Sequence, residues 1–227
     1  MDNGNNTNNK AVTIGISMLI VGTLVGFGIT KATSNTNTMS SAKVNPTSAT
    51  KAADLRANLV TLGVVHMDLT ASAIDAALDG TANAKSLSDA LFTNGDQIGA
   101  AVGSVYGTGA QTTFNTVWKL HLNDFVKYAV AAKGGNEAAK AAALSDIDTN
   151  YTMPLAQYLA KANPKLPEAV LEGSLRDHVT MTATMIDDHV KGDYVSEAAM
   201  RDQGAQHLNG LFSTLAGGIV AQYPDKF

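Results

Sequence analysis

The sequence contains no cysteine, and only 16% of its 227 residues are charged. Without cysteine the chain can form no disulfide, no thiolate metal site, no cysteine nucleophile and no lipid-modified cysteine anchor, and covalently attached c-type haem is excluded. The formal net charge is -4, and no block of basic residues occurs, which argues against nucleic acid as a partner. Apolar residues are abundant instead, since 45% of the residues are hydrophobic.

Common catalytic motifs are also missing. The sequence has no phosphate-binding glycine loop, no G-x-S-x-G elbow and no H-E-x-x-H motif. Residues 103–109 are rich in glycine, but they follow a predicted helix and not a strand, so they indicate a helix-ending loop. The inward Glu and Glu-x-x-His pattern of di-iron carboxylate bundles is absent as well. We therefore predict no catalytic residues and favour a non-catalytic function.

The first 50 residues differ from the rest of the chain. Residues 11–30 form an uncharged run bounded by a lysine on each side, and about 20 apolar residues are what a helix needs to span a bilayer. Because the run exceeds the roughly 7–15 residues of a signal-peptide core, we predict an uncleaved single-pass membrane anchor, with cleavage near Ala32 as the alternative. Residues 1–10 are a short inner tail, and residues 31–50 read as a flexible Ser/Thr/Asn linker. A domain at residues 51–227 would then lie on the extracytoplasmic side.

Apolar residues recur every three or four positions from Lys51 onward, and glycine or proline interrupts the pattern at intervals. This periodicity predicts an all-α, up-down bundle of about six helices in three tandem hairpins. Pro154 should kink the fourth helix or restart it. The expected helices span about 51–79, 84–104, 110–133, 137–160, 166–190 and 194–221.

An internal repeat runs through these segments. Each of His66, His121 and His178 is followed 14 residues later by a glycine. Polar residues recur at positions 66, 94, 121, 150, 178 and 207, in steps of 27 to 29. This is the spacing at which consecutive antiparallel helices return to the same height in a bundle.

Each of these histidines replaces an apolar residue on a helical stripe that should face the core. The sequence therefore predicts a buried polar layer at mid-height, with two threonines and two asparagines supporting the histidines. The predicted ligands are His66, His121, His178 and His207, and the supporting residues are Asn94, Asn150, Thr70 and Thr182.

Buried imidazoles need partners, since an unsatisfied polar group costs about 1–3 kcal/mol. One interpretation is that the layer binds Cu, Zn, Fe or haem without catalysis. A second is that the layer only sets helix packing in a structural or interaction module of the cell envelope, with an envelope protein as partner. A third is a pH-responsive bundle whose imidazoles become charged near pH 6. The fifth histidine, His189, follows Asp187 and Asp188, and these three residues offer a second candidate cation site. Because they lie at a helix end near Lys191, we favour a solvated terminus in which His189 interacts with the C-terminal helix dipole.

Several segments carry a resemblance to a known family. They are Asn94 to Gly99, the Tyr106-Gly107 pair, His121-Leu122, Asn163-Pro164, His178 to Thr182, His207 and the ending Gly218 to Phe227. On these segments, the chain from about Leu55 resembles an uncharacterised family of bacterial membrane-anchored or secreted helical proteins. The resemblance implies the fold and the anchor and no activity. The chain departs from the family pattern at Leu69, Ala71 and Ser213, and a lost acidic residue at the last position would weaken a ligand site.

Overall fold

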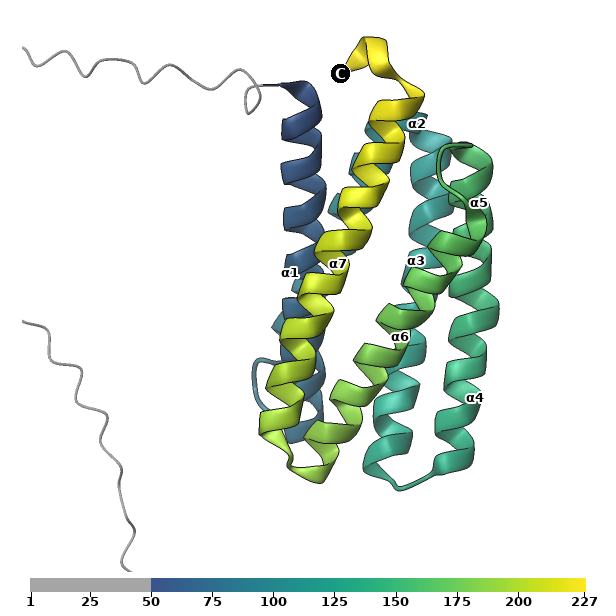
Figure 1. Ribbon diagram of the computed structural model, residues 1–227. Coiled ribbons are helices and arrows are strands. Elements are labelled where there is room, and N and C mark those ends of the chain that lie inside the picture. Colours follow the sequence, from purple (N-terminus) through teal and green to yellow (C-terminus); the bar gives the residue numbers. More distant parts are fainter. Residues whose placement is uncertain (1–49) are drawn as a thin grey trace, which may run out of the picture. The chain divides into compact units, whose positions relative to one another are not determined.

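The computed structural model describes residues 50–227, and all of them belong to one helical unit (Figure 1). The predicted anchor at residues 11–30, its tail at 1–10 and nearly all of the linker at 31–50 lie outside the described residues.

The all-α prediction is confirmed, with six helices packed in an up-down manner in the described part of the chain. Five of the six are continuous, and their ends differ from the predicted bounds by at most two residues. The continuous helices are α1 (Lys51–Asp79), α2 (Ala84–Tyr106), α3 (Thr108–Lys133), α6 (Glu168–Lys191) and α7 (Tyr194–Gln222).

The fourth helix is interrupted, as its proline predicts. It consists of α4 (Glu137–Ile147), the π-helical turn η1 (Asp148–Thr152) and α5 (Met153–Ala162). Pro154 lies in the first turn of α5, directly after η1, and because proline has no N–H it removes one helix hydrogen bond where the two segments join. The π-helical turn accommodates an extra residue and so changes which side chains face inward beyond it.

Glycines end the helices at the lower end of the bundle in Figure 1. Gly80 follows α1 with a φ of 68° and Gly192 follows α6 with a φ of 74°, a left-handed conformation that glycine adopts without steric cost. Asp193 then caps the N-terminus of α7 by accepting a hydrogen bond from the Ser196 N–H at 3.1 Å. These short turns return each chain segment directly into the bundle.

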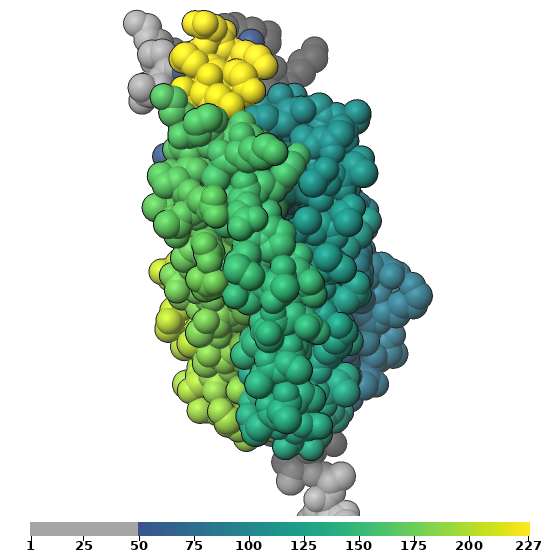
Figure 2. Space-filling model, turned by 90° about the vertical axis from the view of Figure 1, so that its right-hand side faces the viewer, coloured from purple at the N-terminus to yellow at the C-terminus, as the bar shows by residue number. Residues whose placement is uncertain are grey.

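Helix α1 packs against α2 on one side and α7 on the other, and α6 and α3 reach it across the core. Figure 2 shows α3 to α6 covering another face, with the start of α2 protruding at its edge. Among residues 50–227, α1 is the one helix that is long and apolar enough to span a membrane. However, 44% of its most apolar 18-residue window is buried in the bundle. Because core helices share this length and composition, α1 is weak evidence for a span.

The upper end of the bundle is joined by polar side chains from three distant segments. The Tyr106 hydroxyl donates to Gln222 Oε1 at 2.9 Å and accepts from Asn163 Nδ2 at 3.1 Å. Gln222 Nε2 in turn donates to the Ala162 carbonyl at 2.9 Å. This hydrogen-bond network joins the end of α2, the end of α5 and the end of α7.

Candidate metal centre

Three histidines from three helices meet in the centre of the bundle. His66 from α1, His121 from α3 and His178 from α6 are each at most 1% exposed. The ring of His66 lies 5.8 Å from that of His121 and 6.0 Å from that of His178, measured between centroids. One ring nitrogen of each histidine lies within 4.8 Å of the others. The repeat predicted that the three histidines lie at the same height, and in the structure they form a cluster that could hold a metal ion.

The hydrogen bond of His66 fixes which of its nitrogens carries the proton. His66 Nδ1 lies 3.1 Å from Asn94 Oδ1. The orientation of the Asn94 amide is itself fixed, because its Nδ2 donates to the Leu62 carbonyl at 3.1 Å. Since an amide oxygen only accepts hydrogen bonds, the proton is on His66 Nδ1. The lone pair of His66 Nε2 is therefore free, and this nitrogen is buried without a hydrogen-bond partner.

His121 is arranged in the same way by its own helix. Its Nδ1 donates to the backbone carbonyl of Trp118, one turn earlier on α3. The proton is again on Nδ1, and the buried Nε2 of His121 has no hydrogen-bond partner. His178 Nδ1 is likewise buried and unpaired. A backbone or amide carbonyl on one ring nitrogen, with the other nitrogen free, is the arrangement that orients metal-binding histidines.

The three rings are neutral at physiological pH. Burial lowers the pKa of His66 to about 4, against a weaker opposing effect of the Asn94 hydrogen bond. Burial, together with repulsion from His66 and His207, lowers the pKa of His178 to about 3. The pKa of His121 is also well below its ordinary value because of burial and the two neighbouring rings. Neutral imidazole is the form that binds metal ions.

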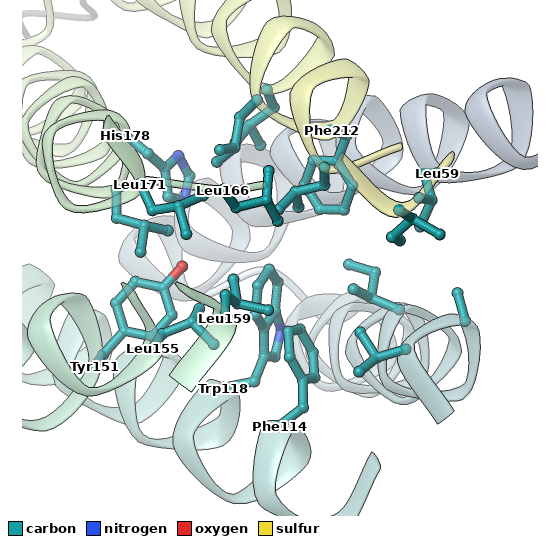
Figure 3. A pocket seen from close by; sticks show the side chains of 18 of the residues that line it. Leu59, Phe114, Trp118, Tyr151, Leu155, Leu159, Leu166, Leu171, His178 and Phe212 are labelled. Atoms are coloured by element: carbon teal, nitrogen blue, oxygen red, sulfur yellow. The ribbon is translucent and has the colours of Figure 1, made fainter. Parts of the chain in front are cut away.

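Aromatic side chains pack against the rings of His66 and His121. The His121 ring stacks on Tyr151 of η1 with centroids 4.0 Å apart, and the Trp118 indole lies 4.9 Å from both His66 and His121. Gly95 on α2 makes room for the indole, since a Cβ there would lie 2.9 Å from Trp118. Figure 3 shows the Tyr151 hydroxyl directed toward the side of the pocket on which His178 lies. Trp118 and Tyr151 were not among the residues predicted for the site, although Trp118 lies on the same stripe as His121.

The remaining predicted residues lie elsewhere. His207 is half-buried, and its Nε2 donates to the Ser174 carbonyl at 2.8 Å. The neighbouring Leu208, at 2% exposed, takes the inward position on α7. Asn150 is exposed on η1, because the π-helical turn directs Tyr151 inward instead.

The two threonines are buried beside the histidines, but their hydroxyls contact the backbone. Thr70 donates to the carbonyl of His66 at 2.8 Å, and Thr182 donates to that of His178 at 2.9 Å. Both bonds follow the i to i-4 pattern of a hydroxyl inside a helix. The side chains therefore support the helix turns that carry the histidines and leave the imidazole rings free.

A second histidine cluster lies at the lower end of the bundle. His189 is buried, with Nδ1 at 3.1 Å from Glu197 Oε2 and 3.3 Å from Asp75 Oδ1, and Nε2 at 3.1 Å from Asp79 Oδ1. The interpretation of His189 as a solvated terminus is therefore wrong. The burial of His189 could have been predicted from the sequence, because His189 continues the apolar stripe of α6 that contains His178 and Met185.

In the second cluster the pKa of the histidine is raised, whereas in the first cluster the pKa of each histidine is lowered. Burial alone would lower the pKa of His189, but the hydrogen bond with Asp79 and the charges of Asp75 and Glu197 raise it above its ordinary value. Burial and the Glu197 charge raise the pKa of Asp75 to about 6. Atoms of Asp75, His189 and Glu197 also lie within 4.8 Å of one another. Here, however, both nitrogens of His189 already face carboxylates.

A cavity of about 400 Å³ reaches the first cluster from the side of α1, α2 and α3, and all three histidines line it. A narrower apolar pocket, with a cavity volume of about 50 Å³, adjoins His178 on the opposite side (Figure 3). Comparisons with protein families, curated proteins and solved structures find no match to this chain. The resemblance to an uncharacterised family therefore stays a prediction.

Proposed function

We propose that this chain binds a single transition-metal ion through His66, His121 and His178. The observation that carries the proposal is the pair of Nε2 lone pairs on His66 and His121. Hydrogen bonds fix both lone pairs as acceptors, burial keeps the rings neutral, and neither nitrogen has a donor. A cation between the rings would satisfy them together with His178, whereas an empty site leaves each nitrogen at a cost of about 1–3 kcal/mol.

The geometry needs only a small contraction to hold an ion. Zn–N bonds are about 2.0–2.1 Å long, so three nitrogens in a tetrahedral site lie about 3.3 Å apart. The nitrogens here lie within 4.8 Å of one another, and small rotations of the side chains would close the difference. Three imidazoles and no carboxylate favour Zn²⁺ or copper over Mg²⁺ and Ca²⁺, which prefer oxygen.

A bare ion suits this site better than haem. The porphyrin occupies four coordination positions of its iron and leaves two axial positions, on opposite faces, for protein ligands. Three imidazoles that converge on one point exceed that number and leave no gap for a flat macrocycle between them. The proposal is therefore narrower than the sequence-based expectation of a metal or haem.

The competing function is a structural module in which the three rings only determine how the helices pack. The carbonyl bonds of His66 and His121 and the stack on Tyr151 favour it, because they give each ring a packing role. Under this alternative, leucine at the three positions should be tolerated or stabilising, since it removes buried polar groups of similar volume.

We further propose that residues 11–30 anchor the chain in a membrane as a single span, with the bundle on the extracytoplasmic side. The support is the uncharged 20-residue run in the sequence. Membrane fractionation of the full chain and of a variant that lacks residues 11–30 tests the anchor. A full chain that stays in the soluble fraction, or a truncated one that stays in the membrane, would contradict it.

The metal proposal is tested by elemental analysis and metal titration of the full chain, purified in detergent with a tag that contains no histidine. We expect one equivalent of Zn or Cu per chain. His66→Leu and His121→Leu should lower the affinity more than about 100-fold, the upper end of what loss of a supporting group causes. The matched control is His189→Gln, which alters a buried histidine of the lower cluster and should leave the affinity unchanged. Full-length protein that takes up none of these metals, and gains stability from the leucine substitutions, would establish the structural alternative.

A further inference from the structure

The 400 Å³ cavity beside the three histidines has an unusual distribution of polar groups. Its walls come mostly from Ala, Leu, Ile, Val and Phe side chains of α1, α2 and α3. The three imidazoles lie at its inner end, and the exposed Val126 and Val130, at 60% and 68%, lie on its lining toward solvent with Lys133. The cavity therefore leads from the surface to the candidate metal centre through apolar surroundings.

The other polar side chains of the cavity leave little for a ligand to bind. The Thr70 hydroxyl is occupied by the His66 carbonyl, and Lys133 Nζ donates to the Leu78 carbonyl near the opening. Ser88 is half-buried on the α2 wall. The imidazole nitrogens, or an ion that they hold, are thus the main polar groups at the inner end.

Charge determines which kind of molecule fits. A divalent ion bound by three neutral imidazoles would place two positive charges in the core, and uncompensated buried charge is strongly unfavourable. No aspartate or glutamate lines the cavity within the described residues. Three protein ligands also leave one coordination position of a tetrahedral ion open. An anionic group from outside would fill that position and reduce the charge.

We propose that the cavity binds a small organic carboxylate with an apolar body, its carboxylate on the open position of the ion and its body between α1, α2 and α3. This inference rests on the proposed metal site and adds the class of ligand. The volume is within the roughly 300–1,000 Å³ of pockets that enclose small molecules. The ammonium group of Lys133 near the opening favours an anion over a cation.

The experiment uses the full chain loaded with Co²⁺, whose visible spectrum reports changes in coordination. Acetate, hexanoate and hexylammonium are titrated as probes. Each CH₂ group that is buried contributes about 0.8 kcal/mol, or about fourfold in affinity. We therefore expect hexanoate to bind at least about tenfold more tightly than acetate, and hexylammonium to leave the spectrum unchanged.

Two variants test the place of binding. Ala129→Leu places a larger side chain in the cavity from α3. Ser88→Leu does the same from α2, at a half-buried position where the added volume disturbs packing less. Either should bring the affinity for hexanoate close to that for acetate while Co²⁺ affinity stays unchanged. Two substitutions on different helices ensure that a folding defect in one does not decide the result.

The outcomes separate the two proposals. A normal Co²⁺ spectrum with hexanoate no tighter than acetate would overturn the ligand inference and leave the metal site standing. Hexanoate binding that persists by calorimetry in metal-free His66→Leu would show that the carboxylate does not bind the ion, which also overturns the inference. A chain that takes up none of Zn²⁺, Cu²⁺ and Co²⁺ would overturn both.

Discussion

The two buried histidine clusters of this bundle shift the pKa of the same side chain in opposite directions. At mid-height, His66, His121 and His178 face one another without a carboxylate, and burial lowers the pKa of each ring. At the lower end, His189 lies among three carboxylates, which raise its pKa despite burial. Because burial lowers the pKa of all four histidines, the carboxylates around His189 account for the difference between the two clusters.

The difference bears directly on metal binding. A neutral ring with one nitrogen bonded to a carbonyl presents the other nitrogen to an ion, as His66 and His121 do. A protonated ring presents two N–H donors, and the carboxylates around His189 already accept both. The mid-height cluster therefore has ring nitrogens without a partner. In the lower cluster both nitrogens of His189 are bonded to carboxylates, and the ion pairs join α1, α6 and α7.

The largest expected effect is the loss of stability of the metal-free chain in mild acid. The unfolded chain protonates its histidines below about pH 6.5, whereas the folded chain keeps His66 neutral down to about pH 4. In this window the unfolded state binds more protons, so the free energy of unfolding falls as the pH falls. A shift of this size corresponds to about 3 kcal/mol from His66 alone, and His121 and His178 add to it.

Urea unfolding of the bundle, followed by circular dichroism between about pH 7.5 and pH 4.5, measures this loss. His66→Leu should make the dependence of the unfolding free energy on pH weaker, because one histidine with a lowered folded-state pKa has been removed. Saturating Zn²⁺ should raise stability near neutral pH and lose this effect in acid, since protons compete for the same nitrogens. A metal-free chain whose stability hardly changes over this range would mean that the three rings are not held neutral.

The second effect concerns Asn94, which orients His66. Asn94→Ala removes the acceptor of the Nδ1 proton and frees the ring to take the other tautomer. Groups that support metal ligands in this way contribute about 10–100-fold to affinity, so we expect a decrease of that order in metal titrations. Glu197→Gln is the matched control in the lower cluster, since it alters a histidine partner without touching the metal centre. Equal metal affinities for both variants would remove the role assigned to Asn94.

These residues show how far sequence reasoning reaches. The helices follow from apolar periodicity and from glycine and proline breaks, and the spacing of the repeat predicted that His66, His121 and His178 share one level. The wrongly placed Asn150 and His207 result from local geometry that helical periodicity does not predict. The π-helical turn η1 exposes Asn150 and buries Tyr151, and on α7 Leu208 faces inward beside a half-buried His207.

The lower cluster was missed for a different reason. His189 and its partner Asp79 are 110 positions apart in the chain. Nothing in a helical period indicates which distant carboxylates a histidine will meet. The charge state of His189 depends on the packing of α6 against α1 and α7, which only the folded structure shows.

A smaller effect is expected from His189→Gln. The substitution removes a cation from a partly buried network, and Asp75 and Glu197 lose the positive charge that both of them face. A hydrogen bond to a charged group contributes about 1.5–3 kcal/mol, and glutamine restores part of it, so we expect a loss of about 1–2 kcal/mol in urea unfolding near pH 6. The raised pKa means that the contribution of His189 is complete below pH 6.5 and is lost as the pH rises through the folded-state value. The cost of His189→Gln should therefore shrink in alkaline solution, opposite to the acid sensitivity of the mid-height cluster.

The smallest effect should come from salt, and it separates the clusters by mechanism. Asp79 is 55% exposed at its side chain, and Asp75 is 24% exposed, so dissolved ions partly screen their attraction to His189. Exposed ion pairs contribute about 0.2–1 kcal/mol, and raising NaCl from about 0.1 M to 1 M should remove a few tenths of this. Because high salt also strengthens apolar burial throughout the protein, the informative quantity is the difference between wild type and His189→Gln at each salt concentration. That difference should narrow with salt, whereas the difference between wild type and His66→Leu should stay constant, because neutral rings carry no charge to screen. If both differences narrowed alike, the mid-height rings would carry charge, and the contrast on which the metal proposal depends would fail.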